Sequence, residues 1–267
     1  MVIRVLIVKF LPLDHIQIIP NQIQELTVLQ GDSNEWREHR RMMLTALIIE
    51  NNLSHLASIS HGIRNEKLAL TELSIQEGIQ IKPCGLFIDS KIPFLGATPD
   101  GITDDMVVEV KCPITAFKLG LEEAIKRKKI TFWKKDGSVN RAHLWYYQIQ
   151  GQLRITGKSV CLFGLWSGSN MPLKVEYIKK DDLFWKDQME VKLVRFYMEC
   201  VLPEIVDSRS KRNMPIRESD QILQAQERRT LKRRLIKRDF SQKRRSTNCP
   251  IIINSVNGVI SFSRLSV

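Results

Sequence analysis

The segment from Pro93 to Pro113, PFLGATPDGITDDMVVEVKCP, constrains the fold of this chain more than any other stretch. A Pro-Asp-Gly turn is followed by a run of valines that is interrupted by Glu109 and Lys111. Strand side chains alternate between the two faces of a sheet, so Glu109 and Lys111 are predicted to share one face while Val108, Val110 and Cys112 face the core. Asp100 ends the preceding strand, and a short hairpin would therefore place it beside Glu109.

The same residues point to a metal site. Two carboxylates that lie close together disfavour ionisation of both, and a divalent cation removes that conflict. Mg²⁺ is a hard cation that takes oxygen ligands, so Asp100, Glu109 and a backbone carbonyl make a reasonable set. Lys111 is placed to orient a water molecule or to neutralise charge on a phosphate. Without these neighbours, Pro-Asp-Gly would be read as an ordinary turn.

Composition favours one folded domain with a tail. The chain has 267 residues, of which 43% are hydrophobic, and that is enough for one sizeable core. No stretch approaches the roughly 18 apolar residues that span a bilayer. The apolar start is interrupted by Arg4 and Lys9 and is not read as a signal peptide. Five scattered cysteines without a CxxC pair argue against disulfides or zinc and favour a reducing intracellular compartment.

The positive charge is concentrated near the C-terminus. Fourteen Lys and Arg but only four Asp and Glu lie between Ser208 and Arg245, so this stretch carries ten of the chain's twelve net positive charges. Such a segment binds phosphate backbones or acts as a nuclear-targeting signal, or it is only a solvated charge run. Basicity is therefore a property of the tail and not of the folded body.

Hydrophobic periodicity predicts alternating helices and strands. Helices are expected over residues 31–47, 62–78, 116–129, 143–156 and 181–205. Strands are expected over residues 81–90, 94–102, 106–112, 159–167 and 172–181. The apolar side of the second helix comprises Ile63, Leu68, Ala69, Leu70 and Leu73, with Gly78 as its stop. This order predicts an α/β (α+β) domain with a mixed sheet flanked by helices.

An aromatic triplet, Trp145, Tyr146 and Tyr147, lies in the fourth expected helix. Such residues can stack on nucleobases. At helical spacing they more often belong to a core, and we therefore assign them to the core.

Five blocks of sequence carry a family resemblance: WREHRRMMLTA, GIRNEKLAL, FLGATPDGITDDMVVEVKCPI, YYQIQGQLRITG and FWKDQMEVKLVRFYMECVLPEI. Their order resembles that of the YqaJ-type viral recombinases, the group to which phage lambda exonuclease belongs, over about residues 30–206. The resemblance implies a restriction-endonuclease-like PD-(D/E)xK core. It also implies a metal-dependent deoxyribonuclease, most directly a 5′-to-3′ exonuclease that acts on double-stranded DNA ends in recombination or repair.

The resemblance also assigns roles to individual residues. It implies that Asp100, Glu109 and the backbone carbonyl of Val110 are ligands of Mg²⁺, for which Mn²⁺ is a substitute. Lys111 matches the catalytic lysine. Glu66 matches an acidic residue that supports the metal site or a second ion.

Two further matches and one departure concern water and the DNA end. Gln148 matches the glutamine that completes the active site near water and the lysine. Arg40 matches the arginine that contacts a terminal 5′-phosphate, although a solvated helix face explains it nearly as well. Leu47 stands where the family usually has a serine that helps to hold that phosphate. A leucine offers no hydrogen bond, so a preference for 5′-phosphorylated ends does not follow.

The expected organisation is an unassigned extension over residues 1–29, a nuclease domain over 30–207 and a basic, partly disordered tail over 208–267. Two alternatives stay open. In the first, the domain is a catalytically silent DNA-binding remnant of a viral or mobile element. In the second, it is a structure-specific endonuclease of the same fold. The resemblance further allows a ring-shaped homotrimer, and no membrane partner is expected.

Overall fold

The computed structural model describes residues 56–169, 171–209 and 212–215, parts of 220–235, and the backbone of 251–256 and 259–264. The chain divides into two compact units, Met1–Val201 and Leu202–Val267. The helix expected over residues 31–47 lies outside the described residues, as do Arg40 and Leu47, and the predictions about them stay predictions.

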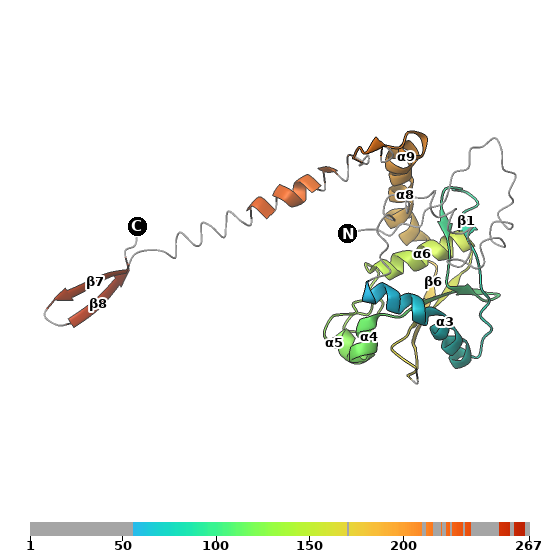
Figure 1. Ribbon diagram of the computed structural model, residues 1–267, viewed down its shortest axis with the longest axis horizontal. Coiled ribbons are helices and arrows are strands. Elements are labelled where there is room, and N and C mark those ends of the chain that lie inside the picture. Colours follow the sequence, from blue (N-terminus) through green and yellow to red (C-terminus); the bar gives the residue numbers. More distant parts are fainter. Residues whose placement is uncertain are drawn as a thin grey trace. The chain divides into compact units, whose positions relative to one another are not determined.

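A four-stranded mixed sheet forms the centre of the first unit (Figure 1). Its strands follow the order β3 (Gly101–Ile102), β4 (Met106–Lys111), β5 (Val160–Leu165) and β6 (Lys174–Lys179). The central pair, β4 and β5, is parallel, and both outer pairs are antiparallel. The predicted mixed sheet flanked by helices is thereby confirmed.

Helices cover both faces of the two central strands. On one face, α6 (Leu144–Thr156) packs Ile149 and Leu153 into a cluster that includes Val107 and Phe163. On the opposite face, α3 (Ala57–Glu77) contributes a second cluster, comprising Ala69, Leu73, Val108 and Leu162. Strands buried on both sides have near-continuous apolar sequences, as β4 and β5 do.

This double burial corrects one prediction. The sequence predicts that Val108 and Val110 face the core, with Glu109 and Lys111 on the other side of the strand. Both faces are in fact core faces, and Glu109 is only 1% exposed. The aromatic triplet in α6 is confirmed as core, because Tyr146 is buried and Trp145 and Tyr147 pack against the same cluster.

Helix α3 is longer than its sequence pattern indicated. It begins at Ala57 and ends at Glu77, and Gly78 forms the predicted stop in a left-handed conformation with φ of 64°. The amides of Gly78 and Ile79 donate to carbonyls of the last turn, which satisfies groups that a helix end leaves unpaired. Ile63 and Leu68, expected on the apolar side, are 63% and 42% exposed.

The helix expected over residues 116–129 is broken in two. Helix α4 (Ile114–Leu119) ends at Gly120, and α5 (Leu121–Lys126) starts directly after it. Gly120 has φ of 77° and ψ of 154°, a conformation that only glycine adopts readily. The apolar periodicity continues across Gly120, so the pattern alone predicted one helix.

The strands expected over residues 81–90 and 94–102 are also shorter than predicted. Residues 81–90 contain β1 (Phe87–Ile88), and residues 94–102 contain β2 (Gly96–Ala97) and β3; β1 and β2 form a separate antiparallel pair. Pro83, Pro93 and Pro99 lie in this region, and proline cannot donate a ladder hydrogen bond.

The helix expected from residue 181 contains two π-helical stretches. Within the first unit it comprises α7 (Asp182–Phe184), η4 (Trp185–Glu190), α8 (Val191–Phe196) and η5 (Tyr197–Val201). Buried side chains recur at every fourth residue, at Trp185, Met189, Leu193, Tyr197 and Val201. An α-helix has 3.6 residues per turn, so a strict four-residue repeat would drift around it. The wider π turns compensate and keep these side chains on one stripe.

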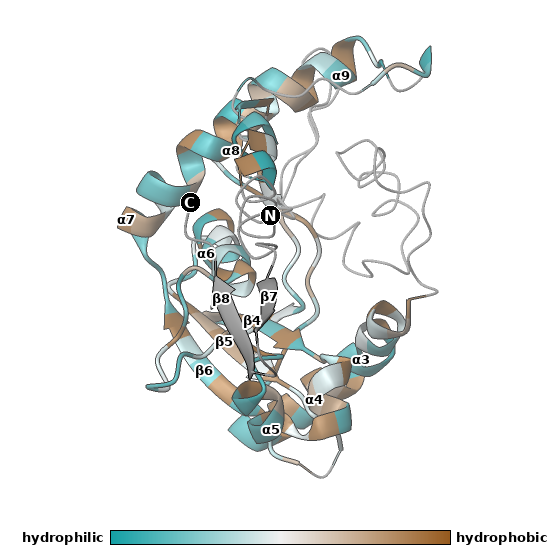
Figure 2. Cartoon of the chain, turned by 90° about the vertical axis from the view of Figure 1, so that its left-hand side faces the viewer, coloured by the Kyte–Doolittle hydropathy of each residue, from teal (hydrophilic) through white to brown (hydrophobic). Residues whose placement is uncertain are grey.

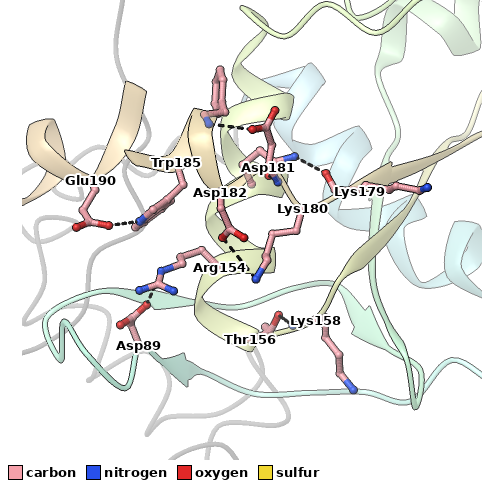
Figure 3. Close-up of polar contacts among 12 residues, drawn as sticks. Asp89, Arg154, Thr156, Lys158, Lys179, Lys180, Asp181, Asp182, Trp185 and Glu190 are labelled. Carbon is pink, nitrogen blue, oxygen red and sulfur yellow. Dashed lines mark hydrogen bonds and ion pairs between the residues drawn. The ribbon is translucent and has the colours of Figure 1, made fainter. Parts of the chain in front are cut away.

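Polar contacts join this helical segment to α6 and to the loop between β1 and β2 (Figure 3). The Arg154 guanidinium of α6 lies 3.6 Å from the buried carboxylate of Asp89 and over the Trp185 ring. The Trp185 indole in turn donates to Glu190. Asp89 also accepts from the amides of the loop, so one side chain orders the loop and docks it on α6.

The second unit begins with α9 (Leu202–Val206) and ends in a hairpin of β7 (Ile251–Val256) and β8 (Val259–Arg264). Helical residues described between 220 and 235 are exposed, including Leu231 and Leu235. No helix in the described part of the chain is both long and apolar enough to cross a membrane.

Leu73 tests the packing of α3 on the sheet. Leu73→Ala removes a fully buried side chain and should lower the free energy of unfolding by about 2–5 kcal/mol, because a cavity remains in the second cluster. Leu68→Ala, on the same helix but exposed, should change it by about 0.5 kcal/mol or less. Urea denaturation of both variants measures the difference, and equal losses would contradict the packing described here.

Candidate active site

Strand β4 and the turn before it bring together the acidic residues of the Pro-Asp-Gly segment. Gly101 pairs with Val108 and Ile102 with Val107, so the register continues to place Asp100 opposite Glu109. The Asp100 carboxylate accepts a hydrogen bond of 2.8 Å from the Val110 amide. The hairpin therefore fixes Asp100 beside the strand that carries Glu109.

Three donors surround the buried Glu109 carboxylate. Lys111 donates to its Oε1 atom from the same strand. Gln148 donates to Oε1 at 2.6 Å and Gln152 donates to Oε2 at 2.7 Å, both from α6. A carboxylate is costly to bury unless it is paired and hydrogen-bonded, and these three side chains meet that requirement. They also hold Glu109 in one orientation.

Lys111 carries the positive charge of the cluster. Burial by itself would lower the pKa of Lys111, but the neighbouring Glu109 and Asp100 carboxylates outweigh it and raise the pKa. The ammonium group is therefore kept protonated across the neutral range. Its side chain is 23% exposed, so it stays within reach of a bound molecule.

The charged form of Lys111 is favoured, whereas the charged forms of Asp100 and Glu66 are disfavoured. Burial, and then the negative charge of Glu109, raise the pKa of Asp100 well above its usual value. The same two causes, in the same order, raise the pKa of Glu66, which projects from α3. The negative charge of Glu109 thus disfavours ionisation of both Asp100 and Glu66, and Lys111 lies beside all three carboxyl groups.

The donor chemistry of this cluster fits a hard divalent cation. Oxygen ligands from carboxylates suit Mg²⁺ or Mn²⁺, and added positive charge would relieve the repulsion among Glu66, Asp100 and Glu109. Within the described residues no three His, Cys, Asp or Glu side chains form a ready-made metal cluster. Glu109 is hydrogen-bonded to side chains instead, so metal binding requires at least part of that carboxylate to exchange partners.

Nearby thiols do not add ligands. Burial, and then the charges of Asp100 and Glu109, raise the pKa of Cys84 to about 12. Burial, and then Glu66 and Asp100, raise that of Cys112 to about 12. Metal-binding cysteines are thiolates, so these two stay protonated and structural.

One member of the cluster was not predicted from the sequence. Gln152 was not considered a site residue, although it follows Gln148 by one helical turn and side chains four apart share a helix face. Its amide donor holds Glu109, while its Oε1 atom is buried with no hydrogen-bond partner among the described residues. The i, i+4 spacing in YYQIQGQ was the available signal. Asp104, by contrast, lies exposed between β3 and β4 and pairs with Lys82, outside this cluster.

Together the fold and this cluster define a class of protein. A mixed sheet whose central strand carries Glu-x-Lys, with an Asp opposite in the preceding hairpin, is the PD-(D/E)xK nuclease core. Residues 28–159 match the family model described as the YqaJ-like viral recombinase domain. This match confirms the resemblance seen in the sequence.

Solved structures with a similar arrangement include bacterial and phage-related exonucleases. The alkaline exonuclease LHK-Exo from Laribacter hongkongensis is 22% identical with a TM-score of 0.47, covering 70% of this chain and 89% of its own. LHK-Exo in complex with dAMP is 21% identical with a TM-score of 0.48 over the same shares. A phage-related exonuclease from Haemophilus somnus 129PT is 14% identical with a TM-score of 0.36, covering 56% and 74%. No protein of curated function matches the chain.

Asp100→Asn tests the electrostatics of the cluster without a metal. Because the folded-state pKa of Asp100 is raised, its ionised form destabilises the fold, fully above the raised pKa and not at all below the unfolded-state value. In EDTA, the asparagine variant should therefore melt a few degrees higher than the wild type at neutral pH. The gain should shrink to nothing as the pH falls below the ordinary value for aspartate.

Asp104→Asn is the matched control for this measurement. The Lys82 ammonium, through its hydrogen bond, lowers the pKa of Asp104, so removing that carboxylate should not stabilise the protein. Thermal melts of both variants over a pH series would contradict the account if Asp104→Asn gained stability and Asp100→Asn did not.

Proposed function

We propose that this chain is a metal-dependent deoxyribonuclease that hydrolyses DNA phosphodiester bonds. The convergence of Asp100, Glu109 and Lys111 at one end of the hairpin carries the proposal, and the YqaJ-like family match of residues 28–159 supports it. Glu66 and Gln148 join the same cluster from two different helices, α3 and α6.

In this proposal one group of residues holds a cation and another stabilises charge on the phosphate. Asp100, Glu109 and the backbone carbonyl of Val110 would hold Mg²⁺, with Glu66 in support and Mn²⁺ as a substitute. The cation would polarise the phosphodiester and make water a better nucleophile. Lys111, protonated beside Glu109, offsets negative charge that develops on the phosphate.

Gln148 and Gln152 keep the cluster in a productive arrangement. Each donates to a different oxygen of Glu109, so the carboxylate cannot rotate freely. Groups that orient a metal ligand in this way are usually worth about 10- to 100-fold in activity or metal affinity. Gln148 is assigned a second role in the proposal, which is to hold the attacking water near Lys111.

The substrate we propose is a double-stranded DNA end, degraded from 5′ to 3′. Family resemblance supports this choice, with Arg40 as the contact to a terminal phosphate and residues 30–207 as the catalytic domain. Leu47 stands in place of the family's serine, so the proposal includes no preference for a 5′-phosphate. The ring-shaped trimer and a nuclear destination for the basic segment stay predictions.

A cleavage assay on matched DNA substrates tests the activity. Purified protein with Mg²⁺ should degrade linear duplex DNA and spare closed circles, and EDTA should stop the reaction. Lys111→Ala should lower the rate about 100-fold or more, because one charge beside the phosphate is lost. Lys158→Ala, which removes a lysine from an exposed contact to the Asp104 carbonyl, is the control and should cleave normally.

The other outcomes separate the alternatives. Binding of DNA without cleavage, insensitive to EDTA, would identify a silent DNA-binding remnant. Cleavage of closed circles would identify an endonuclease. Degradation that persists at full rate in Lys111→Ala would refute the mechanism.

Two buried glutamines of α6 offer a second test. Gln152→Met leaves Glu109 Oε2 without its donor and should lower kcat about tenfold. Gln150→Met is matched in burial, helix and chemistry, but Gln150 bonds Lys179 and Asp181 instead. It should lower stability while leaving kcat per folded molecule unchanged. Steady-state kinetics with a folding check by circular dichroism distinguish the two, and equal kcat values would exclude a positioning role for Gln152.

A further inference from the structure

An exposed aromatic side chain lies close to the catalytic strand. Phe117 is on α4, which starts three residues after Lys111, and its side chain is 52% exposed. The ring lies nearly parallel to that of Trp166, with centroids 5.9 Å apart and an angle of 10°. The backbone amide of Trp166 donates to the Lys111 carbonyl at 2.9 Å, so Trp166 is held next to the end of β4.

Residues from other parts of the fold contact the Phe117 ring and hold it in place. His61 of α3 contacts it with ring centroids 4.9 Å apart and also contacts Trp166, while the Trp166 indole donates to Glu72 at 2.7 Å. A Cβ atom on Gly168 would lie 3.5 Å from the Phe117 ring, so the backbone also approaches it closely. Single exposed aromatics are common, but this one packs against a histidine and a buried tryptophan while about half of its surface stays exposed.

Two cations lie near this aromatic cluster. Lys118 is its neighbour on α4, and Arg64 is on α3, one turn after Ser60, to which it donates at 2.7 Å. After burial, the charges of Arg64 and then Lys118 lower the pKa of His61, which places both near the aromatic cluster. Neither makes an ion pair with a carboxylate in the part of the chain that the structure describes. Helices α3 and α4 lie side by side (Figure 2).

We propose that Phe117 is a stacking platform for a nucleobase of the DNA that enters the active site. This inference rests on the proposed function and adds a binding site to it. Trp166 and His61 hold the ring in place, and Arg64 and Lys118 contact the phosphates on either side of the stacked base. Every base has a π-face, so stacking of this kind is independent of sequence, and phosphate contacts add affinity without specificity. The platform positions the strand next to Lys111.

DNA binding measured with single missing bases tests the proposal. All variants are made in full-length Lys111→Ala, so that the DNA stays intact, and binding to duplexes with a short single-stranded end is followed by fluorescence anisotropy with Mg²⁺. Phe117→Ala should weaken binding about tenfold. Phe117→Trp should bind at least as tightly as phenylalanine, and Phe117→Leu should resemble the alanine variant, because an apolar side chain without a π-system is not enough.

A series of duplexes that each lack one base near the end locates the contact. Removing the stacked base should weaken binding with Phe117 present and have no further effect in Phe117→Ala. Tyr177→Ala, which removes an equally exposed aromatic from β6, should bind normally on every duplex. Melting temperatures of the variants confirm that each is folded.

The results separate this inference from the proposed function. Wild-type protein that cleaves DNA while Phe117→Ala binds as tightly as the Phe117 parent would overturn the platform alone. A loss of the same size on every duplex, whichever base is missing, would do so too, because it would mean that no particular base is stacked. A wild-type chain that neither binds nor cleaves DNA would overturn both.

Discussion

One buried carboxylate organises the structure. Glu109 lies in the central strand of the sheet with 1% of its surface exposed, and it can stay there only because Lys111, Gln148 and Gln152 satisfy its two oxygens. Since two of these donors come from α6, the helix cannot rotate or slide on the sheet without leaving a charge unpaired. The interaction that the proposed chemistry uses is therefore also the one that aligns α6 with β4.

The remaining acidic residues show a conflict between stability and function. Asp100 and Glu66 lie where burial and a neighbouring negative charge raise the pKa of both carboxyl groups. A fold selected for stability alone would have no reason to gather three carboxyls around one lysine. Such perturbed groups concentrate at functional sites, where a cation or substrate supplies the missing charge. The exposed ring of Phe117 lies close to this cluster, because it packs on Trp166, whose amide donates to the Lys111 carbonyl.

Much of the fold could be predicted from local patterns, and the failures have specific causes. The valine-rich strand, the glycine stop at Gly78 and the aromatic core of α6 followed from alternation, turn chemistry and helical spacing. The break at Gly120 did not, because apolar periodicity continues across it. The π-helical turns after Phe184 did not either, since a four-residue repeat of apolar residues resembles an ordinary amphipathic helix until packing is known.

By itself, the sequence determined which residues could form the site. Alternation in β4 put Glu109 and Lys111 on one face, and the Pro-Asp-Gly turn brought Asp100 opposite to them. Only the tertiary structure decided what surrounds that face. A strand pattern records the side on which a residue lies but not whether water or a helix covers it, so the burial of Glu109 and the part played by Gln152 depended on how α6 packs against the sheet, 43 residues further along the chain.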